Sequence, residues 1–195
     1  NAADTISSAI TGSAGLTKNG TGILTLSGNS TYSGATTINA GTLKAGSTTG
    51  LSSSSAFTVG SGAVLDLAGF NNTVSSFSTA SAGTITDSSA TGSGAILKIS
   101  TRLSAAPTNL FTGSLGLNIV GDYILGNANS TYSGGTIYGA NATASRWIGS
   151  GTIGTTTAGV VTSGILGTGT ITFGLAATDK AQFYLFSNTI INNAV

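Results

Sequence analysis

Apolar residues along the chain occur in short bursts in which they alternate with polar residues. Examples are residues 23–26, 63–67 and 96–99, each bounded within a few positions by Gly, Ser or Asn. A period of two is typical of a β-strand with one buried face. Glycine interrupts most stretches that could carry an apolar stripe of helical period. The pattern therefore predicts an all-β protein.

Two all-β architectures are consistent with these strands, an antiparallel sandwich and a parallel β-helix. Sandwich strands usually alternate over five or more residues and are joined by tight hairpin turns, whereas this chain has one Asn-Gly dipeptide, Asn19-Gly20. In a β-helix each coil contributes two or three strands of about 3 to 5 residues, and Gly, Asn or Ser occupy the corners. The short strands favour the β-helix, with coils of roughly 20 to 25 residues.

A long internal repeat also favours the β-helix. The letters NSTYSG occur at residues 29–34 and again at 129–134. The stretch ITGSAGL at 10–16 aligns in the same way with FTGSLGL at 111–117. Because the repeat is much longer than one coil, each unit is expected to comprise several coils.

These alignments define the expected organisation of the chain. We predict a single β-helix segment over residues 1–195, made of two tandem units at about 6–102 and 103–195. The second unit is expected to carry an insertion near 139–157.

Composition excludes several classes of function. The chain has no Cys and no His, so no disulfide framework, thiolate metal site or cofactor is expected. Six scattered cations and a net charge of +1 provide no basic stripe for nucleic acid. No apolar run approaches the roughly 20 residues that span a bilayer, and the start does not resemble a signal peptide, so we expect a mature or excised segment without membrane insertion.

The stretch GLTKNGTGILTLSGNSTYSGATTINAGTLKAG at residues 15–46 resembles the passenger-associated transport repeat of bacterial autotransporters. The stretch FTVGSGAVLDLAGFNNTVSSF at 57–77 resembles the segment that commonly follows this repeat. The resemblance is long and specific across 10–77. It is weaker across 108–138 and 164–195, where GDYILGNA replaces the threonine-leucine strand.

This resemblance implies a right-handed parallel β-helix in a passenger that is exported to the bacterial outer surface or the extracellular space. It implies a structural or display module for adhesion or for an extracellular fibre scaffold, and not an enzyme. The implied partners are adjoining coils of a longer chain or identical subunits end to end, and a host or matrix glycan or protein. Two alternatives remain open: a subunit of a self-assembling extracellular filament, and a polysaccharide-binding or polysaccharide-degrading β-helix.

Two pairs of residues are candidates for surface recognition. Tyr32 and Tyr132 of the repeated letters are expected either to pack at coil corners with their hydroxyls in water, or to form a stacking platform for sugar rings. The corner interpretation is favoured, and Asn29 and Gly34 are then expected to take left-handed backbone there. Arg146 and Trp147 of the insertion indicate either an exposed recognition loop or a cap packed over a coil corner.

Catalysis would require clustered carboxylates, as in the polysaccharide lyases and hydrolases built on β-helices. The chain has five aspartates, and no two lie within 20 residues of each other in the sequence. Asp66 and Asp87, about one coil apart, are the pair most able to converge, with Arg102 near them. Asp66, however, alternates with apolar neighbours as an ordinary outward residue would, so Asp66→Ser is expected to be nearly silent. No catalytic or metal-binding residue is therefore predicted.

The inward side chains are expected to stack on like neighbours from coil to coil. These candidate core residues are Leu24, Leu26, Ile38, Leu43, Val64, Leu65 and Leu67. The stretch 182–195 is also strongly apolar, and an uncapped β-helix edge leaves backbone groups unpaired. It is therefore expected to pair with continuing polypeptide or another subunit through Phe183, Tyr184, Leu185, Phe186, Ile190 and Ile191.

Overall fold

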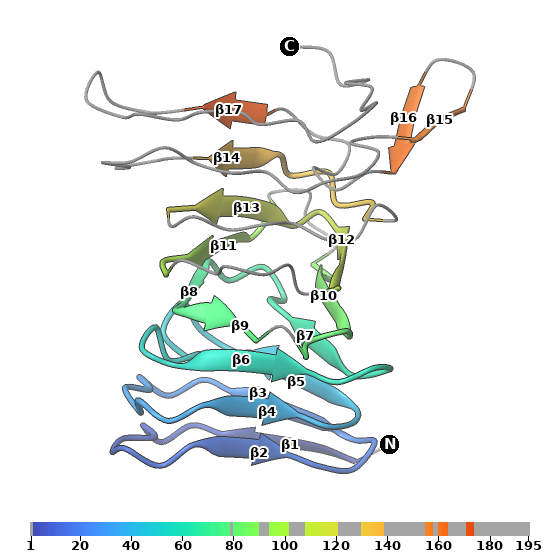
Figure 1. Ribbon diagram of the computed structural model, residues 1–195. Coiled ribbons are helices and arrows are strands. Elements are labelled where there is room, and N and C mark those ends of the chain that lie inside the picture. Colours follow the sequence, from blue (N-terminus) through green and yellow to red (C-terminus); the bar gives the residue numbers. More distant parts are fainter. Residues whose placement is uncertain are drawn as a thin grey trace.

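The protein is a parallel β-solenoid in which successive coils of the chain stack along one axis (Figure 1). The computed structural model describes residues 2–78, 80–89, 94–101, 108–120 and 130–138, together with the strands at 155–157, 160–163 and 171–173. These parts of the chain form about six turns of parallel strands and contain no helix. The predicted all-β parallel β-helix is confirmed.

Three parallel sheets run along the solenoid and carry its coils. Sheet A contains β1 (Ala3–Ile6), β3 (Ile23–Leu26), β5 (Thr42–Ala45), β7 (Val64–Asp66), β10 (Thr84–Asp87) and β12 (Leu110–Gly113). Sheet B contains β2 (Leu16–Lys18), β4 (Thr36–Ile38), β6 (Ala56–Val59) and β9 (Ser76–Phe77). Sheet C contains β8 (Asn72–Val74), β11 (Ile96–Ile99), β13 (Gly116–Ile119), β14 (Thr136–Tyr138) and β17 (Ile171–Phe173).

Hydrogen bonds between adjacent coils measure the length of each coil. The Asn39 amide donates to Asn19 Oδ1 across 20 residues of sequence. The Val59 N–H donates to Ser81 Oγ across 22 residues, and Thr86 Oγ1 donates to the Thr112 carbonyl across 26. The first two intervals fall within the expected coil length of roughly 20 to 25 residues, and the third, at 26 residues, exceeds it slightly.

Strand alternation in sheet A builds one face of the core. Leu24 pairs in register with Leu43, and Leu43 pairs with Leu65. The column continues through Ile85 to Phe111. Leu43, Leu65 and Ile85 have no exposed surface, and Leu24 is half-buried against them. Like side chains stacked at the strand spacing of about 4.8 Å account for this core.

The other residues predicted to lie in the core are buried or half-buried according to the face of the strand on which they lie. Leu26, Ile38 and Leu67 are buried as expected. Val64 is half-buried, because it lies on the opposite face of β7 from Leu65. Its prediction as a core residue is therefore corrected.

Sheet B gives way to sheet C within one coil. β8 and β9 lie on either side of Ser75; β9 pairs with β6 of the preceding coil, whereas β8 pairs with β11 of the next coil. Aromatic rings continue through this transition, with centroid distances of 6.2 Å from Phe57 to Phe77 and 6.5 Å from Phe77 to Phe111. Phe111 lies 6.0 Å from Tyr132 in turn. These four rings form an axial aromatic column.

One strand pair in the described residues is antiparallel. β15 (Thr155–Thr157) pairs with β16 (Val160–Ser163) in a two-stranded sheet of their own. Figure 1 shows this pair beside the stacked sheets. β15 falls at the end of the insertion predicted near 139–157. The pair therefore leaves the parallel stacking of the coils undisturbed.

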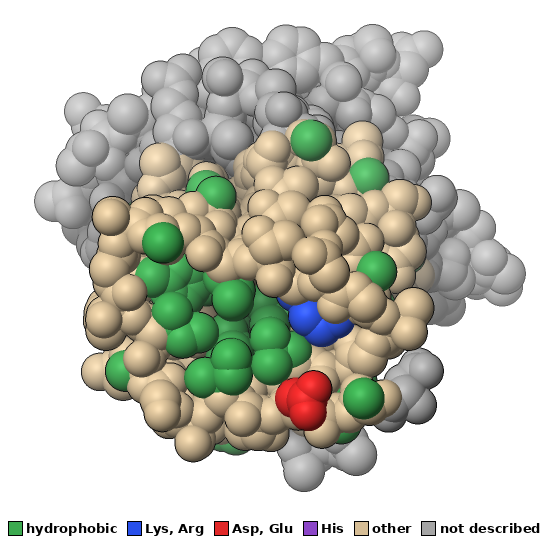
Figure 2. All heavy atoms as spheres, turned by 90° about the horizontal axis from the view of Figure 1, so that it is seen from below, with side chains coloured by type: hydrophobic (Ala, Val, Ile, Leu, Met, Phe, Trp, Pro, Cys, Tyr) green, Lys and Arg blue, Asp and Glu red, His purple; other side chains and the backbone are tan. Residues whose placement is uncertain are grey.

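The N-terminal face of the solenoid displays its cross-section. Figure 2 shows hydrophobic side chains gathered at the centre of this face, inside a rim that is mostly backbone and uncharged polar groups, with a basic and an acidic side chain also visible. This rim is consistent with the composition. Most soluble proteins cover their surface with charged residues, whereas this chain has few of them and uses Ser, Thr, Asn and Gly at its corners. No helix long and apolar enough to cross a bilayer occurs among the described residues.

Gly34 is required for a different reason from the one expected. The described non-glycine residues with positive φ include Ala68 but not Asn29, and Gly34 is absent from the left-handed glycines. A Cβ at Gly34 would instead lie 2.6 Å from the Ala14 carbonyl oxygen of the preceding coil. The same collision recurs at Gly134, where a Cβ would lie 2.7 Å from the Gly116 nitrogen. Close approach between coils therefore selects glycine, and the left-handed prediction is wrong.

Candidate functional site

The tyrosines of the repeated letters are structural residues inside the solenoid. Tyr32 has no exposed surface, and its hydroxyl lies 2.7 Å from Thr36 Oγ1. Thr36 Oγ1 lies 2.8 Å from Ser55 Oγ on the next coil. Tyr132 is equally buried, and its hydroxyl lies 2.7 Å from Thr136 Oγ1. The expected water-facing hydroxyls and the sugar-stacking platform are therefore corrected, because neither ring presents a face to solvent.

Burial also sets the protonation of these phenols. It raises the pKa of Tyr32 above its usual value, although hydrogen bonds with Thr36, Ser52 and Ser55 act in the opposite direction. Burial likewise raises the pKa of Tyr132, against the hydrogen bond with Thr136. Both side chains therefore remain neutral phenols, and their hydroxyls stabilise the corner through hydrogen bonds.

The backbone around the two tyrosines repeats with them. The Thr31 N–H donates to the Ile10 carbonyl at 2.8 Å, and the Thr131 N–H donates to the Phe111 carbonyl at 2.9 Å. The serine after each tyrosine donates in the same way to a left-handed glycine one coil earlier, Ser33 to Gly12 and Ser133 to Gly113. The repeated letters thus encode a coil corner.

Asp66 and Asp87 converge on adjacent coils, as the sequence allowed. The Ser88 N–H and Oγ–H donate to Asp66 at 3.0 and 2.6 Å, so the carboxylate of one coil binds the chain of the next. In return the Gly69 N–H donates to Asp87 Oδ1 at 2.8 Å. The Ala68 N–H, in a residue with φ of 49°, donates to Asp66 at 2.9 Å. The two aspartates therefore brace one corner reciprocally.

The bracing overturns the expectation that Asp66 is an ordinary outward residue. It does share the outward register of Lys44 on β5, but only 6% of its surface is exposed. The corner segments after β7 and β10 fold over it and direct their donors at its oxygens. Asp66→Ser would therefore remove accepting oxygens from a buried site, and it is not a silent change.

Asp87 collects further donors from two more segments. The Ala95 N–H donates to Oδ2 at 2.8 Å and Ser114 Oγ–H donates at 2.9 Å. Ser89 donates through both its N–H and its hydroxyl. Burial alone would raise the pKa of Asp87, but the hydrogen bonds from Ala95, Ser89 and Ser114 hold it below its usual range. The carboxylate is a fully used acceptor rather than a poised acid or base.

The described part of the chain offers few side chains that could bind a metal ion. Within those residues, no three acidic, histidine or cysteine side chains gather in a metal-binding arrangement. Arg102 lies outside the described residues. So do the recognition candidates Arg146 and Trp147 and the edge candidates Phe183, Tyr184, Leu185, Phe186, Ile190 and Ile191.

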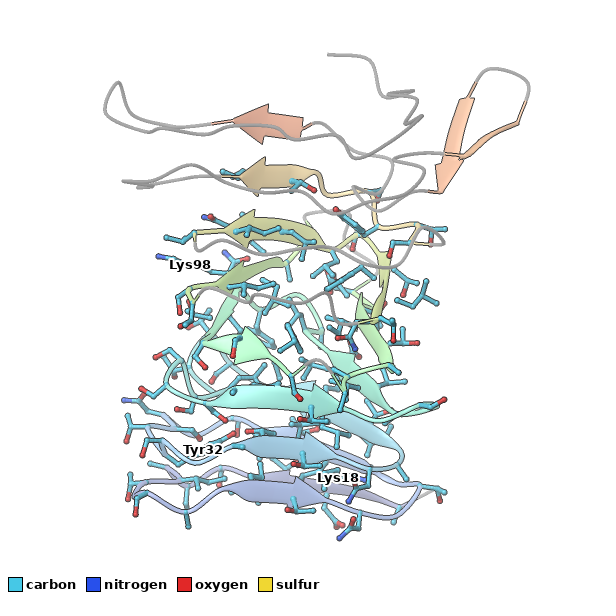
Figure 3. All side chains as sticks on the ribbon, viewed as in Figure 1. Lys18, Tyr32 and Lys98 are labelled. Carbon is cyan, nitrogen blue, oxygen red and sulfur yellow. The ribbon has the colours of Figure 1, made fainter. Side chains whose placement is uncertain are left out.

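Lys18 is a buried cation with a structural role. Only 7% of its surface is exposed, and its Nζ donates to the carbonyls of Asn19, Gly20 and Ala40 at 3.0, 2.8 and 3.1 Å. Figure 3 shows Lys18 at the lower coils, where it bridges two successive corners. Three charge-assisted hydrogen bonds compensate for its removal from water.

The outer side of the solenoid carries two adjoining depressions that sequence reasoning missed. The first, of about 260 Å³, is lined by residues that include Asn29, Ser30, Thr49 and Thr73. The second, of about 210 Å³, is lined by Asn71, Asn72, Thr73, Ile96, Lys98 and Asn118. Thr73 lines both, and the lining residues come from successive coils. We refer to the two together as the axial groove.

The register of sheet C explains how the axial groove forms. Lys98 pairs with Thr73 on one side and with Asn118 on the other, so these three side chains share the outer face. Leu97 and Ile99 beside Lys98 are buried in the core. Figure 3 shows Lys98 on β11, several coils above Lys18. The sequence did show that Lys98 alternates with apolar neighbours and so points outward from a strand. An ordinary solvated lysine has the same pattern, so the sequence did not single out this position.

The geometry described above defines a parallel β-solenoid with stacked coils and corners braced by hydrogen bonds. Residues 16–45 match the passenger-associated-transport-repeat family. The chain therefore contains an autotransporter passenger repeat, and passengers of this kind are displayed at the bacterial outer surface or in the extracellular space. The matched repeat begins at the first residue of β2 and ends at the last residue of β5.

A curated relative extends the similarity beyond the repeat. Over 139 residues the chain is 38% identical to the adhesin BmaC autotransporter of Brucella suis biovar 1 (strain 1330). The aligned region covers 68% of this chain but 4% of that protein. The chain thus spans a small part of the length of the relative that it matches. No solved structure matched the chain.

Proposed function

We propose that this chain is a structural and display module of an autotransporter-like passenger, serving adhesion or an extracellular fibre scaffold at the bacterial surface. The observation that carries the proposal is the coincidence of the family match with the coils. The repeat at 16–45 corresponds to the four consecutive strands from β2 to β5. The repeat is thus a structural unit of the solenoid.

The architecture suits a display role. Coils contact their neighbours through ladders of parallel strands around an apolar interior, so a solenoid of this kind extends by the addition of further coils. Among the described residues, the buried carboxylates of Asp66 and Asp87 and the buried Lys18 are occupied by corner hydrogen bonds. The similarity to a protein named an adhesin supports a non-enzymatic role. In this proposal the partners of the coils are adjoining coils of a longer passenger.

We also propose that the solenoid is built from two tandem units, about 6–102 and 103–195. Matched corner contacts support this division, because the Tyr32–Thr36 and Tyr132–Thr136 hydrogen bonds occupy equivalent places. The Leu16 N–H donates to the Ala35 carbonyl, and the Leu117 N–H donates to the Gly135 carbonyl in the same way.

Display on living cells tests the proposed function. Residues 1–195 are fused upstream of an autotransporter translocator, and intact bacteria are probed with protease and antibody. We expect the chain at the surface, and a Leu65→Asp variant, with a charge in the core column, to be exposed less efficiently or degraded. Retention of the parent chain in the periplasm would refute the display role.

The same cells separate adhesion from scaffolding. Adherence to epithelial monolayers and to extracellular matrix is compared between bacteria that display the chain and bacteria that display the translocator alone. Greater adherence with the chain supports an adhesive role. Equal adherence of the two strains would support a scaffold role for the chain instead of an adhesive one.

A further inference from the structure

The axial groove is lined by groups that both donate and accept hydrogen bonds. Asn29, Thr31, Thr49 and Ser53 are exposed in its first half. Asn71 is exposed in its second half, next to Ile96, which is 37% exposed. Amides and hydroxyls beside a small apolar surface are the groups that bind the hydroxyls and the apolar ring faces of sugars.

Charge in the groove has one sign. Lys98 is the only charged side chain that lines it among the described residues. The Lys98 amine is flanked in register by Thr73 and Asn118, which are uncharged. A single cation suits one carboxylate or sulfate and is too little for a polyphosphate chain.

Two buried polar atoms in the groove lack a partner. Ser30 is 6% exposed, and its Oγ has no hydrogen-bond partner. The equivalent Ser130 hydroxyl accepts from the Phe111 N–H at 3.2 Å, so the unused hydroxyl of Ser30 is a property of this groove and not of the repeat. Asn118 Oδ1, in the other half, is likewise buried and unpaired. Buried polar atoms are nearly always satisfied, so each indicates a place for a ligand group.

We propose that the axial groove binds an extended acidic oligosaccharide, with a carboxylate or sulfate at Lys98 and ring hydroxyls along Asn29, Ser30, Thr73 and Asn118. The lining residues repeat at the coil spacing of about 4.8 Å, which is close to the length of one pyranose unit in an extended glycan. A linear sugar polymer parallel to the axis therefore meets similar groups at each unit. This inference rests on the proposed surface display, since only a displayed groove meets such a glycan.

Binding to the purified chain tests the proposal. Isothermal titration at low salt compares a hyaluronan hexasaccharide, a heparan sulfate hexasaccharide and a neutral chitin hexasaccharide. We expect one or both acidic sugars to bind more tightly than the neutral one, and the affinity to fall as salt rises. The hyaluronan and heparan sulfate arms distinguish a carboxylate from a sulfate at Lys98. Failure of both acidic sugars to bind at millimolar concentration would overturn the proposal.

Matched variants locate the site. Lys98→Gln is expected to weaken binding of the acidic sugar by at least about tenfold, whereas Lys44→Gln, a half-buried lysine on sheet A, leaves it unchanged. Asn118→Leu removes the unpaired acceptor and is expected to weaken binding without lowering the melting temperature. Equal affinity of Lys98→Gln and the parent would place the sugar elsewhere and refute the assignment.

The length of the ligand tests whether both halves of the groove are used. Ser30→Ala is expected to weaken the hexasaccharide but not a disaccharide held at Lys98. An equal effect on both would contradict an extended ligand. These measurements are independent of the display assay, so a displayed chain that fails to bind sugar would refute this inference alone.

Discussion

Asp87 shows how one side chain stabilises several coils. It accepts hydrogen bonds from Gly69 on the preceding coil and from Ser114 on the following coil. Only 3% of its surface is exposed, so its donors replace the water that a carboxylate would otherwise bind. In a chain with so few charges, such a carboxylate is a structural centre of a corner.

Acid should expose the contribution of Asp87. Its pKa is lower in the folded chain than in the unfolded chain, where it is about 3.9. Its stabilising effect is therefore fully present above pH 4 and is lost as the pH falls through the folded pKa. We expect Asp87→Asn to be less stable at pH 7 by about 1 to 3 kcal/mol, and to lose less stability than the parent between pH 4 and pH 2.

Thermal unfolding followed by circular dichroism across pH 2 to 7 measures this effect. Asp4→Asn, at an exposed position of β1, is the matched control and should follow the parent at every pH. Parallel pH profiles for Asp87→Asn and the parent would show that the carboxylate does not carry the acid sensitivity.

Thr36 connects two buried hydroxyls at the tyrosine corner. Thr36→Val removes the 2.7 Å partner of the Tyr32 hydroxyl and the 2.8 Å partner of the Ser55 hydroxyl, whereas Tyr32→Phe removes one partner of Thr36 and leaves Thr36 bonded to Ser55. We expect Thr36→Val to lower the free energy of unfolding by about 1 to 3 kcal/mol, and Tyr32→Phe to cost less. Urea unfolding of both single variants and of the double variant measures the coupling. A costlier Tyr32→Phe would contradict this arrangement.

At the scale of elements, the spacing between coils determines which residues the corners accept. Strands of sheet B and the corners before them approach so closely that the Gly34 position has no room for a side chain. The strands of sheet A, in contrast, tolerate Leu, Ile and Phe in one inward column, because that column faces the solenoid interior. Glycine is thus selected at the corner by the close approach of the neighbouring backbone, whereas the strand positions are selected for apolar side chains that fill the interior.

Gly34→Ala tests the close approach of the corner. A Cβ there would collide with the backbone of the preceding coil, and overpacking of a fixed backbone typically costs about 1 to 3 kcal/mol. We expect a lower melting temperature for Gly34→Ala, while Ser33→Ala at the neighbouring exposed position changes it little. Equal melting temperatures for the two variants would show that the coils can separate to admit a methyl group.

At the scale of the whole molecule, the axial aromatic column joins sheet A, sheet B and the later coils. Phe77 stands in the middle, in tilted contact with Phe57 and in edge contact with Phe111. Such pairs contribute about 0.5 to 1.5 kcal/mol beyond the apolar area that they bury. The column spans the coil in which sheet B ends and sheet C begins, so it supports the solenoid where its ladders change.

Phe77→Ala should therefore weaken both sides of this transition. Removal of a buried phenylalanine typically costs about 3 to 5 kcal/mol, and a solenoid transmits the loss to the adjacent coils first. We expect amide hydrogen exchange to accelerate in β6 and β12 more than in β3. Uniform acceleration along the chain would indicate a single cooperative unit instead.

The sequence by itself determined the all-β class, the parallel coils and the repeat, because strand alternation and coil length are local properties that recur along the chain. The stacked core at Leu43 and Leu65 followed from the same alternation. The stretch at residues 15–46 also carried the family resemblance, and the family match covers residues 16–45.

Only the tertiary structure decided what surrounds each corner residue. Asp66 meets donors that lie 22 residues away, and Gly34 meets the backbone of a preceding coil, so local pattern showed neither the buried brace nor the steric demand. The axial groove depends in the same way on the register that aligns Thr73, Lys98 and Asn118 on one outer face. Burial and register arise from stacking, and stacking brings together residues that the sequence separates by a full coil.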